Sequence, residues 1–182
     1  AAAINWYGVT DITDGQWHHV VCVADRDGNG SIYVDGLIDG APVNISGSNL
    51  TLEEPDRDFV IGVSNVTGSL GSHFDGNIAD VRMFNSALTA TQILDLYNGS
   101  DISSPVGWWK LDKGADDFSG NGNDGTITSA NLVGEAAYFD GVDDYVSIDT
   151  DSLDDLPNSD FSVTAWAKFN VLGENIENRI FN

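Results

Sequence analysis

Short runs of alternating apolar and polar residues, each ended by Gly, Asn or Asp, constrain the fold of this chain more than any other feature. Such runs occur at 17–24, 31–34, 59–63, 76–84, 106–111, 136–139, 145–148 and 161–169. A period of two is typical of a strand that buries one face, and glycine-rich breaks are typical of tight turns. The pattern predicts an all-β fold, arranged as a two-sheet antiparallel jelly-roll sandwich.

One segment has helical spacing instead. Thr89 and Gln92 have the spacing of a capping box, in which the two residues satisfy each other's free backbone donors. Ile93, Leu96 and Tyr97 then fall on one face of a helix. We therefore expect one short helix near residues 89–97.

The charge balance excludes several classes of partner. The chain has 29 acidic and 7 basic residues, a formal net charge of −22. Such a surface repels nucleic acid and anionic lipid, and no apolar run approaches the roughly 18 residues that a membrane helix needs. We expect neither nucleic-acid binding nor membrane insertion. The acidity itself has three open interpretations, which are calcium sites, a high-salt habitat and simple solubility.

Two groups of motifs resemble the halves of one known domain, in reversed order. The segments 107–111, 117–125, 138–146 and 161–166 resemble the opening half of a laminin-G-like, concanavalin A-type jelly roll. The segments 14–21, 31–36, 74–84 and 87–97 resemble its closing half, yet they come first. Three arrangements remain open: a circularly permuted domain, a fragment of a tandem array, or a domain shared between two chains.

The resemblance divides the chain into three parts. Residues 1–99 correspond to the C-terminal half of a jelly roll, and residues 107–182 correspond to an N-terminal half. Residues 100–106, with their Ser and Pro, have the composition of a linker. The two halves belong to the same domain if the chain is permuted, and to successive domains in a tandem or subunit-swapped arrangement.

The resemblance also implies a structural calcium ion. The Asp-Phe-Ser-Gly-Asn-Gly-Asn-Asp-Gly loop at 117–125 matches the family's calcium loop. Carried over, it implicates Asp117, Asn121 and Asn123, with Asp80 as a distant ligand and Asp143 as a further candidate. Carboxylate and amide oxygens are the ligands that calcium prefers. The alternative is a Gly/Asn loop that only water solvates.

Four Asn-x-Ser/Thr sequons predict glycosylation in an exported protein. They begin at Asn44, Asn49, Asn65 and Asn98, in predicted loops or element ends where a glycan has room. Together with the acidic composition, they favour an extracellular or cell-surface location.

Neither catalytic nor zinc-binding motifs were found. The chain has no Glu-x-Asp-x-x-Glu run, Gly-x-Ser-x-Gly elbow, His-Glu-x-x-His helix or phosphate loop. The adjacent residues His18 and His19 point to opposite faces of a strand, so a structural role is expected for both. The chain is therefore predicted not to be an enzyme.

Aromatic residues leave a sugar-binding role open. Trp6, Tyr7, Trp108 and Tyr145 could form a platform for a glycan, although most aromatic residues here are expected in the core. In the pair Trp108 and Trp109, alternation directs one ring inward and the other outward.

These observations predict a non-catalytic extracellular structural or adhesive module. In this hypothesis the chain is a repeat or subunit of a surface filament, self-associates so that a neighbouring subunit completes its fold, and is stabilised by calcium. The alternative is a calcium-dependent, lectin-like carbohydrate-binding module of a larger surface protein. A hydrolase of the same fold ranks last, because the carboxylate motif is missing.

Overall fold

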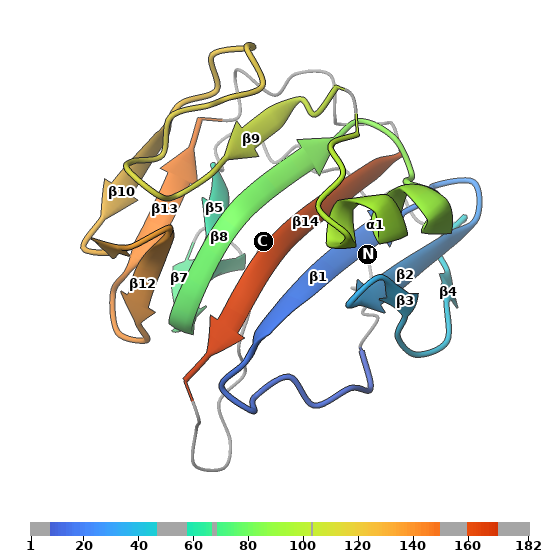
Figure 1. The fold of residues 1–182 in the computed structure, drawn as a ribbon, viewed down its shortest axis with the longest axis horizontal. Helices are drawn as coiled ribbons and strands as arrows, with labels where there is room; N and C mark the ends of the chain where they lie inside the picture. The colour runs from blue at the N-terminus through green and yellow to red at the C-terminus, as the bar shows by residue number, and fades with distance from the viewer. Residues whose placement is uncertain (1–7, 47–57, 67–68, 103, 150–159, 171–182) are drawn as a thin grey trace.

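Antiparallel strands form two packed layers in the computed structural model, and one helix lies across the larger layer (Figure 1). The structure describes residues 8–46, 58–66, 69–102, 104–149 and 160–170. The prediction of an all-β antiparallel sandwich with one short helix is confirmed.

The elements are β1 (Trp17–Ala24), β2 (Asn29–Val34), β3 (Leu37–Ile38), β4 (Val43–Asn44), β5 (Phe59–Ile61), β6 (Val63–Val66), β7 (Ser69–His73), β8 (Asp75–Phe84), α1 (Ala90–Tyr97), β9 (Gly107–Trp109), β10 (Gly125–Thr128), β11 (Asn131–Val133), β12 (Ala136–Asp140), β13 (Tyr145–Ile148) and β14 (Phe161–Phe169).

Strands from both halves of the chain alternate in the larger sheet. Its nine strands include the path β11-β12-β8-β14-β1-β2-β3, with β4 on β2 and β9 on β8. Strand β14, from the second half, pairs with β1 on one side and β8 on the other. A three-stranded sheet, β10-β13-β5, and a two-stranded sheet, β6-β7, make up the remainder.

The main core lies between the nine-stranded and three-stranded sheets. Ile61, Val146 and Ile148 from the smaller sheet pack with Ile78 and Phe139 from the larger one, and all five are fully buried or nearly so. Trp109 is also fully buried there, and its indole Nε1 donates to the Asn123 carbonyl at 2.7 Å. Burial of these apolar side chains is the main force that holds the layers together.

A second core cluster lies beneath α1. Ile93 and Leu96 of the helix pack on Val21, Val23 and Phe84 of the sheet. The predicted capping box is present: the Thr89 hydroxyl accepts from the Gln92 N–H, and the Gln92 side chain accepts from the Thr89 N–H. No helix among the described residues is long and apolar enough to span a membrane.

Candidate functional site

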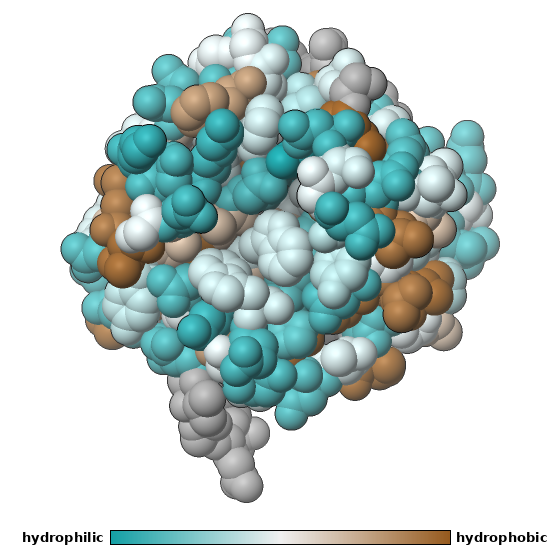
Figure 2. All heavy atoms as spheres, in the orientation of Figure 1, coloured by the Kyte–Doolittle hydropathy of each residue, from teal (hydrophilic) through white to brown (hydrophobic). Residues whose placement is uncertain are grey.

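The face of the nine-stranded sheet that carries α1, named here the helix face, is only partly covered by that helix. Successive strand residues point to opposite faces, so the neighbours of core residues lie on this side. The helix face carries Trp17, His19, Asp80, Arg82, Trp108, Trp166 and Lys168 from the sheet and Tyr97 from α1. In Figure 2 the middle of this face is hydrophilic, and strongly hydrophobic residues lie mostly toward its sides.

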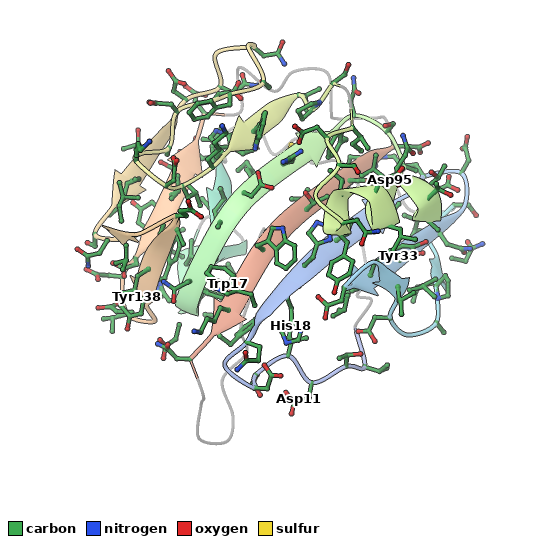
Figure 3. All side chains as sticks on the ribbon, viewed as in Figure 1. Asp11, Trp17, His18, Tyr33, Asp95 and Tyr138 are labelled. Atoms are coloured by element: carbon green, nitrogen blue, oxygen red, sulfur yellow. The ribbon has the colours of Figure 1, made fainter. Side chains whose placement is uncertain are left out.

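Three rings form a cluster beside the helix. The Tyr97 and Trp166 rings are nearly parallel, with centroids 5.9 Å apart and planes at 24°. The His19 ring lies 5.3 Å from Trp166 and 6.3 Å from Tyr97. Trp17 lies at the end of β1 and is 40% exposed, so it extends the aromatic surface toward solvent (Figure 3).

His19 is buried and is neutral at physiological pH. Its Nδ1 atom has no hydrogen-bond partner within the part of the chain that the structure describes. Burial lowers the pKa of His19 to about 4, because a charged imidazolium loses its hydration there. The nearby carboxylates of Asp80 and Asp35 oppose this shift, and Arg82 adds to it.

His18, on the opposite side of β1, has different surroundings. Its Nδ1 lies 2.9 Å from an Asp35 oxygen, and its Nε2 lies 3.1 Å from Asp14. Burial lowers the pKa of His18, but the two carboxylates outweigh that effect and raise it overall. The expectation that the two histidines face opposite ways and have structural contacts agrees with these positions.

An ion-pair network lies next to the aromatic cluster. The Arg82 guanidinium donates to both Asp80 oxygens, at 3.1 and 3.0 Å, and to Asp101 at 2.8 Å. The Asp80 carboxylate also accepts from the Trp108 indole at 2.6 Å. Burial lowers the pKa of Arg82, whereas the hydrogen bonds and charges of Asp80 and Asp101 raise it more strongly. The network therefore fixes a charged guanidinium against the Trp108 ring, 4.3 Å from its centroid.

A backbone irregularity positions Asp80. The pairing of β14 with β8 shifts register between Thr164 and Trp166, beside Asp80, whose φ is +50°. This left-handed conformation is unfavourable for a residue with a side chain. The Asp80 N–H donates to the Lys110 carbonyl at 3.1 Å, which joins the bulge to the chain after β9.

A second aromatic pair completes the helix face. The Trp108 and Phe118 rings meet edge to face at 6.2 Å, and Phe118 is 49% exposed. The Lys110 ammonium lies 4.8 Å from the Trp108 centroid and 4.4 Å from that of Phe118. Aromatic rings beside fixed polar groups are the usual components of a small-molecule site.

Asp117, a predicted calcium ligand, accepts hydrogen bonds from the loop that follows it and from β9. One carboxylate oxygen accepts from the N–H groups of Trp108, at 2.9 Å, and Ser119, at 2.8 Å. The other accepts from the Ser119 hydroxyl at 2.7 Å and the Asn123 N–H at 2.9 Å. Burial raises the pKa of Asp117, but these donors lower it overall. These four donors hold the carboxylate in place, and its role as a calcium ligand stays a prediction.

The other predicted ligands of this loop are also engaged as donors. The Asn121 and Asn123 amides donate to the Val106 carbonyl, at 3.1 and 2.7 Å. The Asn123 Oδ1 atom is buried without a partner among the described residues. Asp80 accepts a hydrogen bond from the Trp108 indole and pairs with Arg82. Asp117 accepts a hydrogen bond from the Trp108 backbone N–H. Calcium binding by these four residues stays a prediction.

Asp143 lies in a different group of carboxylates. Ligand atoms of Asp140, Asp143 and Asp144 are within 4.8 Å of one another. Asp144 is 2% exposed and accepts from the Asp140 N–H at 2.7 Å. Burial and the charges of Asp140 and Asp143 raise the pKa of Asp144. These contacts agree with the expected turn chemistry, and the calcium requirement stays a prediction.

The remaining predicted residues are dispersed. Asn44 and Asn98 are exposed, at β4 and at the C-terminal cap of α1. Asn65 lies in β6, and Asn49 falls outside the described residues. Trp6 and Tyr7 also fall outside them. Tyr145 lies on β13, in the smaller sheet, and is remote in the fold from the helix face.

Sequence reasoning found Trp108 but missed Tyr97, Trp166, Phe118 and Arg82. Tyr97 was assigned only to the apolar face of the helix, and Trp166 only to a strand. Two signals were available: Trp166 is flanked by two alanines on its strand, and Arg82 follows Asp80 at a spacing of two. Neither signal indicates the pairing of β14 with β1 and β8, which is what brings these residues together.

Comparison with known families agrees with this geometry. The model of a laminin-G-type family, described as the concanavalin A-like lectin/glucanases superfamily, matches residues 2–94, just over half of the 182 residues. No curated protein and no solved structure matches the chain significantly. Laminin-G-like domains are generally non-catalytic binding modules and typically occur in extracellular proteins. The chain belongs to the concanavalin A-like lectin/glucanase superfamily.

Proposed function

We propose that this chain is a non-catalytic, extracellular carbohydrate-binding module and that a glycan binds across the helix face. The supporting observation is the arrangement of two aromatic pairs, Tyr97 with Trp166 and Trp108 with Phe118, around a fixed Asp80–Arg82 ion pair. Sugars offer apolar ring faces to aromatic side chains and hydroxyl groups to charged ones. A carboxylate held by an arginine accepts hydroxyl hydrogen bonds without needing to reorient.

A binding role accounts for the carboxylates better than hydrolysis does. A glycosidase needs one carboxyl group that carries a proton to the leaving oxygen. On the helix face, Asp80 and Asp101 both accept hydrogen bonds from Arg82. Both carboxylates are therefore suited to accept hydrogen bonds from ligand hydroxyl groups, and neither is suited to donate a proton.

We propose further that the chain is a self-contained, permuted sandwich. The support for this is the intramolecular pairing of β14, from the second half, with β1 and β8, from the first half.

The filament hypothesis has separate support at the edges of the nine-stranded sheet. Leu37 and Ile38 on β3 and Leu132 and Val133 on β11 are all at least 40% exposed, at opposite edges of one sheet. Apolar edge strands favour association between copies.

Binding to a panel of soluble and insoluble glycans tests the carbohydrate hypothesis. We expect wild-type protein to bind a neutral glycan and Trp166→Ala to lose most of that affinity. Tyr145→Ala removes a half-buried aromatic side chain from the other sheet and serves as the matched control. Absence of wild-type binding to every glycan, in calcium and in chelator alike, would overturn the proposal.

A further inference from the structure

The helix face ends in a pocket between β9 and the segment that follows α1. The pocket has a volume of about 350 Å³. It is lined by Arg82, Asp101, Ile102, Ser104, Pro105, Trp108, Phe118 and Ser119. Ligand pockets usually range from roughly 300 to 1,000 Å³, so this one lies at the small end of that range, a size suited to one sugar unit.

Contacts on both sides fix the wall formed by residues 101–102 and 104–106. At one end, Asp101 accepts from Arg82 at 2.8 Å, which ties the wall to β8. At the other end, the Val106 carbonyl accepts from Ser119, Asn121 and Asn123, and the Val106 N–H donates to Met83 at 2.7 Å. Ile102 packs against the core cluster beneath α1. These contacts hold the wall in place in the absence of a ligand.

The lining offers one half-exposed aromatic ring and several acceptors. The Trp108 ring contacts the cations of Arg82 and Lys110, whereas Phe118 contacts Lys110 alone of these two and is 49% exposed. The Asp101 side chain is 73% exposed although one of its oxygens binds Arg82. Ser104 contributes a hydroxyl group, whereas the Ser119 hydroxyl is bound to Asp117. The pocket thus combines an aromatic side chain that can stack on a sugar ring with polar groups that can hydrogen-bond to the sugar hydroxyl groups.

The charges indicate a neutral sugar. The positive charges of Arg82 and Lys110 are balanced by the negative charges of Asp80 and Asp101, and the whole chain carries −22. An acidic sugar placed here would meet two carboxylates and an unfavourable overall field. Neutral hydroxyl groups donate to those carboxylates without this repulsion.

We propose that the pocket binds the terminal, uncharged monosaccharide unit of a glycan, so that the module recognises chain ends. This inference rests on the proposed glycan binding at the helix face. It assigns Phe118 to stacking and Asp101 to hydroxyl recognition, and it gives the aromatic surface around Trp166 to the adjoining units.

Calorimetry with neutral linear glucan and mannan oligosaccharides of one to six units tests the proposal, together with a polysaccharide before and after partial hydrolysis. We expect the binding capacity per gram to rise with the number of chain ends, and affinity to level off after two or three units. Phe118→Ala should weaken binding at least roughly tenfold. Leu70→Ala removes a similarly exposed apolar side chain, 44% exposed on β7, and should leave binding unchanged.

Two outcomes contradict the inference in distinguishable ways. Affinity that rises steadily to six units and is insensitive to Phe118→Ala and Asp101→Asn would mean that the glycan lies across the helix face without entering the pocket. In that case the proposed function stands and end recognition fails. Absence of binding by the wild-type protein to every sugar tested would remove both.

Discussion

The Asp80 carboxylate accepts the Trp108 indole N–H at 2.6 Å and also binds the Arg82 guanidinium. One residue in a left-handed backbone conformation, with φ of +50°, therefore connects β8 to β9 across the helix face. Arg82 is 9% exposed, so removal of its main partner leaves a nearly buried charge incompletely paired.

Asp80→Asn is accordingly expected to destabilise the protein by about 1–3 kcal/mol, a range set by the partial exposure of the carboxylate. Asp101→Asn serves as the control, because its side chain is 73% exposed and exposed ion pairs contribute only about 0–1 kcal/mol. Urea unfolding of both variants measures the difference. Equal losses would contradict a special role for Asp80.

The Asp117 loop gives a prediction that separates a turn residue from a metal ligand. Asp117→Ala removes an acceptor of four hydrogen bonds from Trp108, Ser119 and Asn123. We expect a loss of about 1–3 kcal/mol, and the same fall in thermal midpoint in calcium and in chelator. A fall seen only in calcium would restore Asp117 as a calcium ligand.

The sequence-based prediction of bound calcium is tested at a different residue. We expect calcium to raise the thermal midpoint of the wild-type protein, because three close carboxylates at Asp140, Asp143 and Asp144 repel one another without a cation. Asp143→Asn should abolish that rise. A midpoint that is insensitive to calcium in the wild-type protein would refute the calcium prediction altogether.

Local patterns predicted the fold well because each one acts over a few residues. The alternation at 17–24 and 161–169 corresponds to β1 and β14 with identical bounds, and the capping box at Thr89 is formed as expected. Strands β3, β4 and β11 were missed because they have only two or three residues, too few for a period to be recognised, and they are held by pairing with longer neighbours. Strands β6, β7 and β10, of four or five residues, were missed as well.

The site was predictable only in part, because it depends on pairing between distant segments. The alternation of Trp108 with Trp109 predicted one ring inward and the other outward, and the structure buries Trp109 and leaves Trp108 half-buried. The contact between Tyr97 and Trp166 joins residues from α1 and β14, which no local pattern relates. The loop motif at 117–125 predicted calcium ligands, which stays a prediction; what the motif did not indicate is that the Asp117 carboxylate accepts hydrogen bonds from three backbone N–H groups.

His19 gives the protein a pH dependence of stability with a defined sign. Its pKa is about 4 when folded and about 6.5 when unfolded. The unfolded chain therefore binds the proton more readily between these values. The contribution of the neutral His19 is fully present above pH 6.5, and up to about 3 kcal/mol is lost as pH falls to 4.

His19→Phe should flatten the pH dependence in that window, as measured by urea unfolding at several pH values. The groups around His19 that also carry charge are Asp35, Asp80 and Arg82. His18 has a raised pKa, so its contribution is present at low pH and is lost as pH rises through the folded value. His18→Phe is therefore the matched control, and it should alter the profile in the opposite direction. Unchanged slopes in the His19 variant would contradict this assignment.

Gly76 is expected to tolerate no side chain. Its φ is +148°, and an added Cβ would meet the Lys168 carbonyl and the Cα of Phe169 on β14. Both contacts are with backbone atoms, so neither can rotate away, and the central pairing of β8 with β14 would have to shift. We expect Gly76→Ala to lower the free energy of unfolding by about 3 kcal/mol or more.

Gly99→Ala is the control, because φ is +80° there and nothing lies within 4 Å of an added Cβ. This variant should lower the free energy of unfolding by only about 1 kcal/mol. Similar losses at both positions in thermal unfolding would contradict the packing argument.

The mass of the native protein distinguishes a self-contained sandwich from a shared one. Strand β14 lies between β8 and β1 of its own chain, so a monomer already pairs both of its edges. We expect light scattering to give a mass near 19.4 kDa that does not change over a wide concentration range. Added salt should not change this mass, although salt screens the repulsion that the net charge of −22 produces. If larger species form instead, Val133→Lys and Leu37→Lys distinguish two routes. Suppression by these variants would indicate association through the edges β11 and β3, whereas persistence would indicate exchange of β14 between subunits and would overturn the self-contained arrangement.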